Sequence, residues 1–293
     1  MAEIIQKDGT WVFAGDALRL TPGRDRNVSL LRRALGELEV PLRALAGVSF
    51  EQGKRSGRLR LRLRDGADPL LLATAGRLAE ADDPYQLPVE SDRYGVAEYF
   101  AQEVRNSLLL DGIPSAPVTG YLLPGPSLPV AAAAGDGAAD FDGERVRLEW
   151  NWKTEDAKSA TGTRTIPLAD IDAVQWQPAS GLENGCLRFT VRGAPPATPP
   201  KYDPNAVELW GFRKDPLMAL VAAAVQARLP HPSAPAAVPA VPRQALPPGG
   251  PPAAEDDHDA LLRRLRELGE LHRSGVLTEE EFALAKRAVL QRM

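Results

Sequence analysis

The clearest chemical pattern in this sequence is a run of cations between Lys54 and Arg64. The run contains no acidic residue, and its six basic residues are Lys54, Arg55, Arg58, Arg60, Arg62 and Arg64. The last four occupy alternate positions, so on a β-strand they line one face at steps of about 6.6 Å. Such a face could meet the phosphates of a lipid headgroup or nucleic acid. The interpretation we favour is that the arginine stems cover the outer face of a sheet and pair with acids on neighbouring strands, such as Glu37, Glu39 and Glu51.

Patterns typical of an active site are weak. The three histidines, His231, His258 and His272, all lie outside residues 9–112 and 136–229, which argues against zinc sites and histidine-based catalysis there. The segment 47–55 has five residues between its glycines and Arg55 where a phosphate loop needs Ser or Thr, and Gly135-Asp136-Gly137 lacks the third glycine of a dinucleotide fingerprint. Both are interpreted as turns.

Carboxylates and other reactive side chains also favour structural interpretations. Asp170 and Asp172 are the best carboxylate pair for metal or acid/base work, but a solvated strand face or turn is favoured, as is a turn for Asp82 and Asp83. Cys186 lies in a predicted strand and is expected to be a buried apolar residue. We therefore predict that the protein is not an enzyme, with no catalytic residue, no metal and no cofactor.

The elements that carry these residues come from an internal duplication. Segment 11–20 shares Phe, Gly, Arg and Leu at equal spacing with segment 139–148, 128 residues later. Segment 40–50 matches 166–176 at 126 residues, and 57–64 matches 185–192 at 128. This period exceeds the roughly 20 to 50 residues of a solenoid or propeller unit, so each copy should have its own core. Phe13 and Phe141 are expected to be equivalent and buried.

Each copy is predicted to be a small antiparallel β-domain closed by a C-terminal helix. Short runs in which apolar and polar residues alternate indicate strands. In segment 58–64 the leucines are expected on a buried face and the arginines on a solvent-exposed face. Apolar residues at three- and four-residue steps after Gly95 predict a closing helix in the first copy. Asp215 and Pro216 are expected to cap and start the corresponding helix of the second. The fold class is mainly β (α+β), and a β-barrel or sandwich plugged by a helix is the layout of a PH-like domain.

Two segments of the chain resemble known families. The duplicated blocks, the run Phe141-Asp142-Gly143-Glu144-Arg145-Val146-Arg147-Leu148-Glu149-Trp150-Asn151-Trp152-Lys153 and the segment Tyr202-Asp203-Pro204-Asn205 resemble a bacterial family of tandem PH-like domains of unknown function. Residues 259–293 resemble a SHOCT module, a short C-terminal helical domain found at the end of many bacterial proteins. These resemblances imply a fold and no catalytic residue. Trp150 and Trp152 are expected in a core or domain interface, with an exposed aromatic contact as the alternative.

Proline-containing segments are expected to divide the chain. Copy 1 is predicted at residues 1–112, a linker at 113–135 and copy 2 at 136–229. Residues 230–258 begin with nine prolines in 23 residues, which predicts a disordered, semi-extended tether.

The tail at residues 259–293 is predicted to be a helical hairpin. Its first helix carries Leu261, Leu265 and Leu268 on one stripe, and its second carries Phe282, Ala285 and Val289. Thr278 and Glu281 form a capping box at the start of the second helix. Two helices of this length bury too little apolar surface to be stable alone. The hairpin should therefore dock on a second copy of itself, on the body or on a partner.

Net charge, cysteine content and hydropathy limit the classes of function that fit the sequence. The formal net charge of −4 disfavours a nucleic-acid binder, and the single cysteine fits a reducing compartment. The N-terminus shows no signal-peptide pattern, and no apolar run is long enough to span a bilayer, so we expect a cytoplasmic protein. We predict a binding or scaffold protein with tandem recognition domains and a C-terminal hairpin for oligomerisation or partner docking. The alternative is a peripheral sensor of anionic membranes or ligands that uses the Lys54 to Arg64 stripe.

Overall fold

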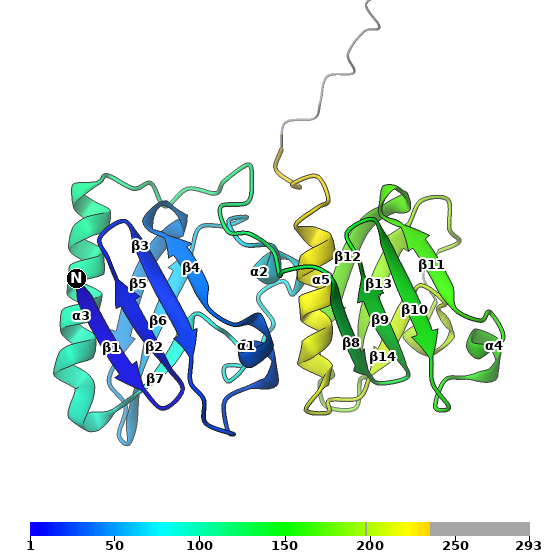
Figure 1. The fold of residues 1–293 in the computed structure, drawn as a ribbon, viewed down its shortest axis with the longest axis horizontal. Coiled ribbons are helices and arrows are strands. Elements are labelled where there is room, and N and C mark those ends of the chain that lie inside the picture. The colour runs from blue at the N-terminus through cyan, green and yellow to red at the C-terminus, as the bar shows by residue number, and fades with distance from the viewer. Residues whose placement is uncertain (197, 235–293) are drawn as a thin grey trace, which may run out of the picture. The chain divides into compact units, whose positions relative to one another are not determined.

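The first copy folds into two antiparallel sheets and a long C-terminal helix (Figure 1). The structure is a computed structural model that describes residues 1–196 and 198–234. One sheet has the order β1-β2-β3-β4 and the other the order β5-β6-β7. The strands are β1 (Ala2–Gln6), β2 (Gly9–Phe13), β3 (Ala17–Pro22), β4 (Leu38–Pro41), β5 (Leu45–Glu51), β6 (Ser56–Leu63) and β7 (Gln86–Glu90). The helices are α1 (Leu30–Leu35), α2 (Pro69–Ala73) and α3 (Tyr94–Leu110), with short 3-10 turns η1 (Leu42–Ala44) and η2 (Ser91–Arg93).

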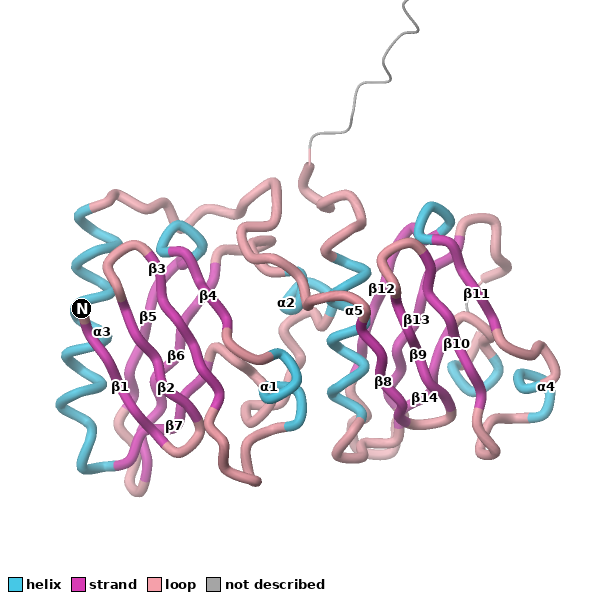
Figure 2. The backbone as a smooth tube through the Cα atoms, in the orientation of Figure 1, coloured by secondary structure: helices cyan, strands magenta, loops and turns pink. Residues whose placement is uncertain are grey.

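The second copy repeats this plan (Figure 2). Its sheets have the orders β11-β10-β9-β8 and β12-β13-β14. The strands are β8 (Val130–Ala134), β9 (Gly137–Phe141), β10 (Arg145–Trp150), β11 (Arg164–Pro167), β12 (Ile171–Gln177), β13 (Gly185–Val191) and β14 (Ala206–Leu209). The helices are α4 (Asp156–Ser159) and α5 (Met218–Gln226), with the 3-10 turns η3 (Leu168–Asp170), η4 (Pro200–Tyr202) and η5 (Asp215–Leu217).

The predicted duplication is confirmed by details of the backbone. Phe13 ends β2 and Phe141 ends β9, and both side chains are buried. The pairing register slips between Leu45 and Gly47 in the first copy and between Ile171 and Ala173 in the second, 126 residues later. Such a slip is a β-bulge-like irregularity, in which one strand has an extra residue relative to its partner. Its recurrence at equivalent positions shows that both halves have one fold, which is mainly β as predicted.

Helix α5 is buried on all sides because it is shared between the copies. Every residue from Met218 to Gln226 is buried, whereas α3 buries one stripe, formed by Ala97, Phe100, Ala101 and Val104. The core around α5 also contains Leu31, Leu70 and Ala73 from the first copy, and α2 packs directly on α5. A helix that is apolar all round needs cover on every face. The two copies therefore share one continuous core at α5.

The start of α5 differs from the sequence expectation. A 3-10 turn, η5, precedes the helix, and the Asp215 carboxylate accepts the N–H groups of Gly211 and Phe212, at 2.7 and 3.1 Å. Asp215 thus closes the loop before the helix and does not cap α5, because its side chain reaches back along the chain.

The segments between and after the copies pack on the body. Strand β8 begins at Val130, within the stretch that the sequence assigned to the linker. Val118 and Leu122 donate backbone hydrogen bonds to Asp65 and Ala67 of the first copy. His231, expected in the tether, is 9% exposed, and its Nε2 lies 3.0 Å from the Gly66 carbonyl oxygen. The rest of the predicted tether and the hairpin, with Leu261, Leu265, Leu268, Phe282, Ala285 and Val289, lie outside the described residues.

None of the helices in the described part of the chain has the length and apolar character needed to cross a membrane.

Candidate functional site

Strand β6 places the arginine stripe on one exposed face of the first copy. Leu59, Leu61 and Leu63 are at most 6% exposed, whereas Arg58, Arg60 and Arg62 are exposed. Lys54 and Arg55 are exposed in the turn before β6, and Arg64 is half-buried at its end. The predicted alternation is confirmed, and the stripe is open to solvent.

The partners of the stripe differ from the expected ones. Arg58 pairs with Glu80 at 2.5 Å, and the Arg64 guanidinium donates to the carbonyl oxygens of Ala116 and Arg43 at 2.8 and 3.1 Å. Glu37 pairs with Arg19 instead, and within residues 1–196 and 198–234 neither Glu39 nor Glu51 forms an ion pair with the stripe. Glu39 lies in the other sheet, opposite Arg19, whereas Glu51 lies opposite Arg58 on the neighbouring strand β5 without pairing with it. Arg60 and Arg62 have no ion pair in the described part of the chain.

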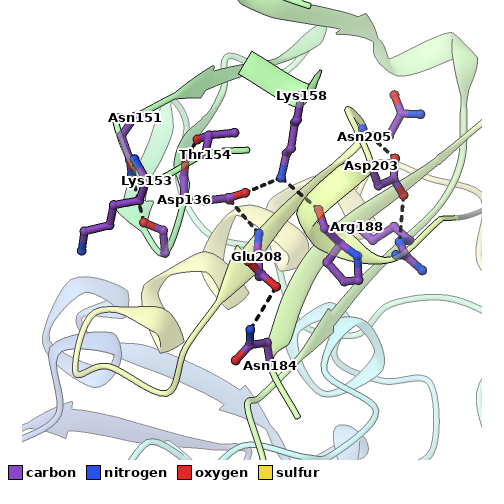
Figure 3. Close-up of polar contacts among 12 residues, drawn as sticks. Asp136, Asn151, Lys153, Thr154, Lys158, Asn184, Arg188, Asp203, Asn205 and Glu208 are labelled. Carbon is purple, nitrogen blue, oxygen red and sulfur yellow. Dashed lines mark hydrogen bonds and ion pairs between the residues drawn. The ribbon is translucent and has the colours of Figure 1, made fainter. Parts of the chain in front are cut away.

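The second copy neutralises the equivalent positions. Arg188 on β13 corresponds to Arg60, and it forms an ion pair with Asp203 at 3.1 Å and donates to the Thr198 carbonyl oxygen at 2.6 Å (Figure 3). Arg192 corresponds to Arg64 and pairs with Asp172 at 2.9 Å. The two copies have therefore diverged at one strand face: it is open and cationic in the first and compensated in the second.

A pocket of about 450 Å³ lies beside the stripe, between β6 and α2. Arg60, Arg62 and Arg64 line it together with the buried residues Asp68 and Tyr85. The Asp68 carboxylate accepts the N–H groups that open α2 and a 2.8 Å hydrogen bond from the Tyr85 hydroxyl. Burial raises the pKa of Asp68 to about 6, although these hydrogen bonds oppose the shift. The pocket thus combines surface guanidinium groups with a carboxyl group that titrates just below neutral pH.

A buried ion pair organises one end of the second copy (Figure 3). Lys158 Nζ lies 2.5 Å from the Asp136 carboxylate, and the two side chains are 0% and 2% exposed. Lys158 also donates to the Pro200 carbonyl oxygen at 3.0 Å, and Asp136 accepts the Glu208 N–H at 2.8 Å. Burial lowers the pKa of Lys158 and raises that of Asp136, while the contact between them opposes both shifts.

The first copy buries a cation at the corresponding place. Arg32, 126 residues before Lys158, is 5% exposed, and burial lowers its pKa against the attraction of Asp8, Asp83 and Asp82. A buried cation facing the first hairpin turn is therefore a feature of both copies. We interpret this buried cation as a feature that stabilises the fold, because the Lys158 and Asp136 side chains are inaccessible to solvent.

An exposed aromatic surface lies close to this pair. We define it as Trp152, Lys153, Trp210 and Phe212: the Lys153 ammonium lies 5.1 to 5.8 Å from the centroids of the three rings. Trp152 is 88% and Phe212 59% exposed. The Asn151 side chain fixes the loop by donating to the Gly135 carbonyl oxygen at 2.9 Å and accepting the Lys153 N–H at 2.9 Å. For Trp152 the exposed alternative holds, whereas Trp150 is half-buried beneath Lys158.

The other candidates have structural partners. Asp172 is paired with Arg192, and Asp83 caps its own turn by accepting the Tyr85 N–H at 2.9 Å. Cys186 is 5% exposed, as predicted, and burial raises its pKa. The described residues hold no cluster of three or more His, Cys, Asp or Glu side chains suited to a metal ion.

Comparison with family models identifies the family to which the chain belongs. The model described as Domain of unknown function (DUF4429) matches twice, at residues 11–105 and 139–226. The chain belongs to this family. A second model, Short C-terminal domain (SHOCT), matches residues 263–290. No curated protein matches the sequence.

The DUF4429 copies also contain features that sequence reasoning missed. Lys158 and Asp136 are 22 residues apart, with no motif linking them, and their pairing depends on the fold of the second copy. Trp210 and Phe212 follow β14 and reach the Lys153 ammonium because β14 lies near the turn between β8 and β9, where Asp136 accepts the Glu208 N–H. For Trp152 an exposed aromatic contact was among the sequence-based alternatives, and the alternation of aromatic residues in Trp210-Gly211-Phe212 was a further signal that was not used.

Proposed function

We propose that this protein is a non-enzymatic binding scaffold whose tandem DUF4429 body recognises a protein partner through the aromatic surface of the second copy. The observation that supports this most is the exposure of Trp152 and Phe212 around the Lys153 ammonium. Tryptophan is enriched among the residues that contribute most to binding at protein interfaces, which makes a cluster of exposed aromatic side chains a candidate interaction site. The surface is fixed before binding by the Asn151 hydrogen bonds, so little conformational entropy is lost on association.

The partner that fits this surface is a protein segment with apolar and acidic side chains. The three rings offer stacking area, and the lysine among them offers one positive charge to a carboxylate. Leu182, fully exposed on the turn between β12 and β13, is a further exposed apolar side chain of the second copy. We also propose that each copy has a PH-like fold and that the protein is cytoplasmic. The arrangement of seven strands in two sheets closed by a helix supports the PH-like fold, and the single cysteine supports the cytoplasmic location.

Photo-crosslinking tests the aromatic surface. A benzophenone amino acid at Trp152 should give a discrete adduct with one protein in the cells that express this chain. The adduct should disappear when Lys153→Glu and Phe212→Asp are added. The matched control is the same probe at Tyr99, which is 56% exposed on α3 of the first copy and should give no adduct. Equal adducts from both positions would contradict the proposal.

The SHOCT segment is proposed to make the body multivalent. Its match at residues 263–290 and its leucine and phenylalanine spacing support self-association, which would raise avidity without changing any single contact. Sedimentation should show a larger mass per particle for the full chain than for one ending at Ala234, and Leu265→Asp with Phe282→Asp should remove the difference. Equal monomeric masses would leave partner docking as the role of this segment.

A second function, recognition of an anionic ligand by the stripe, is favoured by the contrast between Arg60 and Arg188. The first is exposed without an ion pair in the described part of the chain, and the second is held by Asp203. Vesicles with anionic lipid should then bind the protein, and binding should fall with salt and with Arg60→Glu plus Arg62→Glu. The matched variant Arg188→Glu should leave binding unchanged, and binding that survives the stripe substitutions would exclude this function.

A further inference from the structure

A second group of arginines, distinct from the stripe, meets where the two copies join. Arg26 lies in the segment after β3, Arg33 lies on α1, and Arg213 lies between β14 and η5. Helix α1 contacts both η5 and α5, and Figure 2 shows α1 beside α5. Arg213 Nη2 donates to the Arg26 carbonyl oxygen at 3.1 Å. Segments 187 residues apart in the sequence are thus brought together by the packing of one copy on the other.

These arginines surround a shallow depression of about 520 Å³ whose other lining residue is Asn27. All four residues are exposed. Among the described residues, none of the three guanidinium groups forms an ion pair with a carboxylate. The depression is therefore lined by cations whose charge the described chain leaves uncompensated.

The carboxylates of three acids in the segments around the depression accept hydrogen bonds and form no ion pair with its arginines. Asp25 accepts the Asn27 N–H at 2.8 Å, and Asp82 accepts the Ser29 hydroxyl at 2.5 Å. Asp215 accepts two N–H groups of its own loop. Three like charges around one depression repel one another, and an anion placed among them would relieve that repulsion.

We propose that the junction of the two copies binds a phosphate group carrying at least two negative charges. Guanidinium groups match phosphate oxygens with paired N–H donors, and the Asn27 amide can donate to a further oxygen. Arg26, Asn27 and Arg33 come from the first copy and Arg213 from the second, so a bound phosphate contacts both. Binding should therefore tighten the junction, which the stripe on β6 alone cannot do. This site is independent of the aromatic surface.

Titration calorimetry of the full-length protein with pyrophosphate tests the site directly. Arg33→Gln is the cleanest variant, because among the described residues the Arg33 side chain makes no hydrogen bond or ion pair, and the backbone N–H that donates to the Ser29 carbonyl oxygen is kept. It should weaken binding by about tenfold, as expected for loss of one charge-assisted contact. Arg213→Gln should do the same, and Arg213→Lys should restore part of the affinity. The stripe variant, Arg60→Gln with Arg62→Gln, reports any binding at the second candidate surface. The matched control is Arg147→Gln, an exposed arginine of the second copy outside both the junction and the stripe, and it should leave the affinity unchanged.

Two further measurements separate the possible outcomes. Pyrophosphate should slow hydrogen exchange both in residues 23–29 and in residues 211–215, because the ligand contacts both copies. Vesicles containing phosphatidic acid distinguish the source of the phosphate: binding to vesicles that Arg33→Gln abolishes supports a lipid headgroup, and binding to pyrophosphate alone supports a soluble ligand. Absence of binding to both probes, or binding that only the stripe variant weakens, would overturn the proposal.

Discussion

Removing the Lys158 amine should destabilise the second copy far more than removing an exposed cation of similar geometry. Lys158→Met keeps an unbranched side chain of similar length but leaves the Asp136 carboxylate, 2% exposed, without its cation. The Pro200 carbonyl oxygen also loses its 3.0 Å donor. The ring of Trp150, 4.5 Å from the amine, keeps an apolar neighbour in the variant.

The magnitude follows from the burial of the pair. Breaking a buried ion pair by removing one partner costs about 3–5 kcal/mol, because a charge is left without compensation. For a body of this size that corresponds to a fall of about 6–20 °C in the melting temperature. Arg147 and Glu149 provide the matched control: their atoms also lie 2.5 Å apart, but their side chains are 55% and 49% exposed. Arg147→Met should cost at most about 1 kcal/mol.

Thermal and urea denaturation followed by circular dichroism give the comparison. Adding Asp136→Asn to Lys158→Met should recover much of the lost stability, since the buried charge is then gone, and the double-mutant cycle gives the coupling between the two residues. Equal losses for Lys158→Met and Arg147→Met would show that burial does not govern this pair, and the structural role assigned to it would be wrong.

Two further predictions concern the first copy and its junction. The raised pKa of Asp68, about 6 against 3.8, means that the folded state holds this proton more tightly than the unfolded state does. The unfolding free energy of the wild type should therefore fall by about 3 kcal/mol relative to Asp68→Asn as the pH rises from about 3 to about 7. Urea titrations at several pH values can check this, and parallel pH profiles for the two proteins would refute the raised pKa. Leu70→Ala, in the core shared with α5, should cost about 2–5 kcal/mol, whereas Leu109→Ala, 79% exposed on α3, should change stability by about 0.5 kcal/mol or less. Similar denaturation midpoints for these two variants would argue against a shared core.

The duplicated fold could be predicted because its signals are local and occur twice. The alternation of leucine and arginine in β6 shows which face is buried, and the repeated spacing around Phe13 and Phe141 places equivalent strands. Strand β8 was not recognised, because Val130-Ala131-Ala132-Ala133-Ala134 has no alternation of polar and apolar residues. Pairing with β9 makes it a strand.

The candidate sites were harder to predict because they depend on contacts between distant segments. The exposed arginines of β6 follow from the strand pattern, but the divergence of Arg60 and Arg188 depends on Asp203, which lies on another segment. The meeting of Arg213 with Arg26 depends on how one copy packs on the other. No periodicity along the chain encodes such a contact.

Oxidative footprinting inside cells tests the central claim, that the aromatic surface is covered by a protein partner. Hydroxyl radicals modify side chains according to their exposure, so the rates for Trp152 and Phe212 can be compared between purified full-length protein and the same protein in the cells that express it. We predict at least severalfold slower modification of both residues in cells, with Tyr99 on α3 modified at the same relative rate in the two samples and with the protection lost in Lys153→Glu. Equal rates for Trp152 in purified protein and in cells would contradict the proposed function.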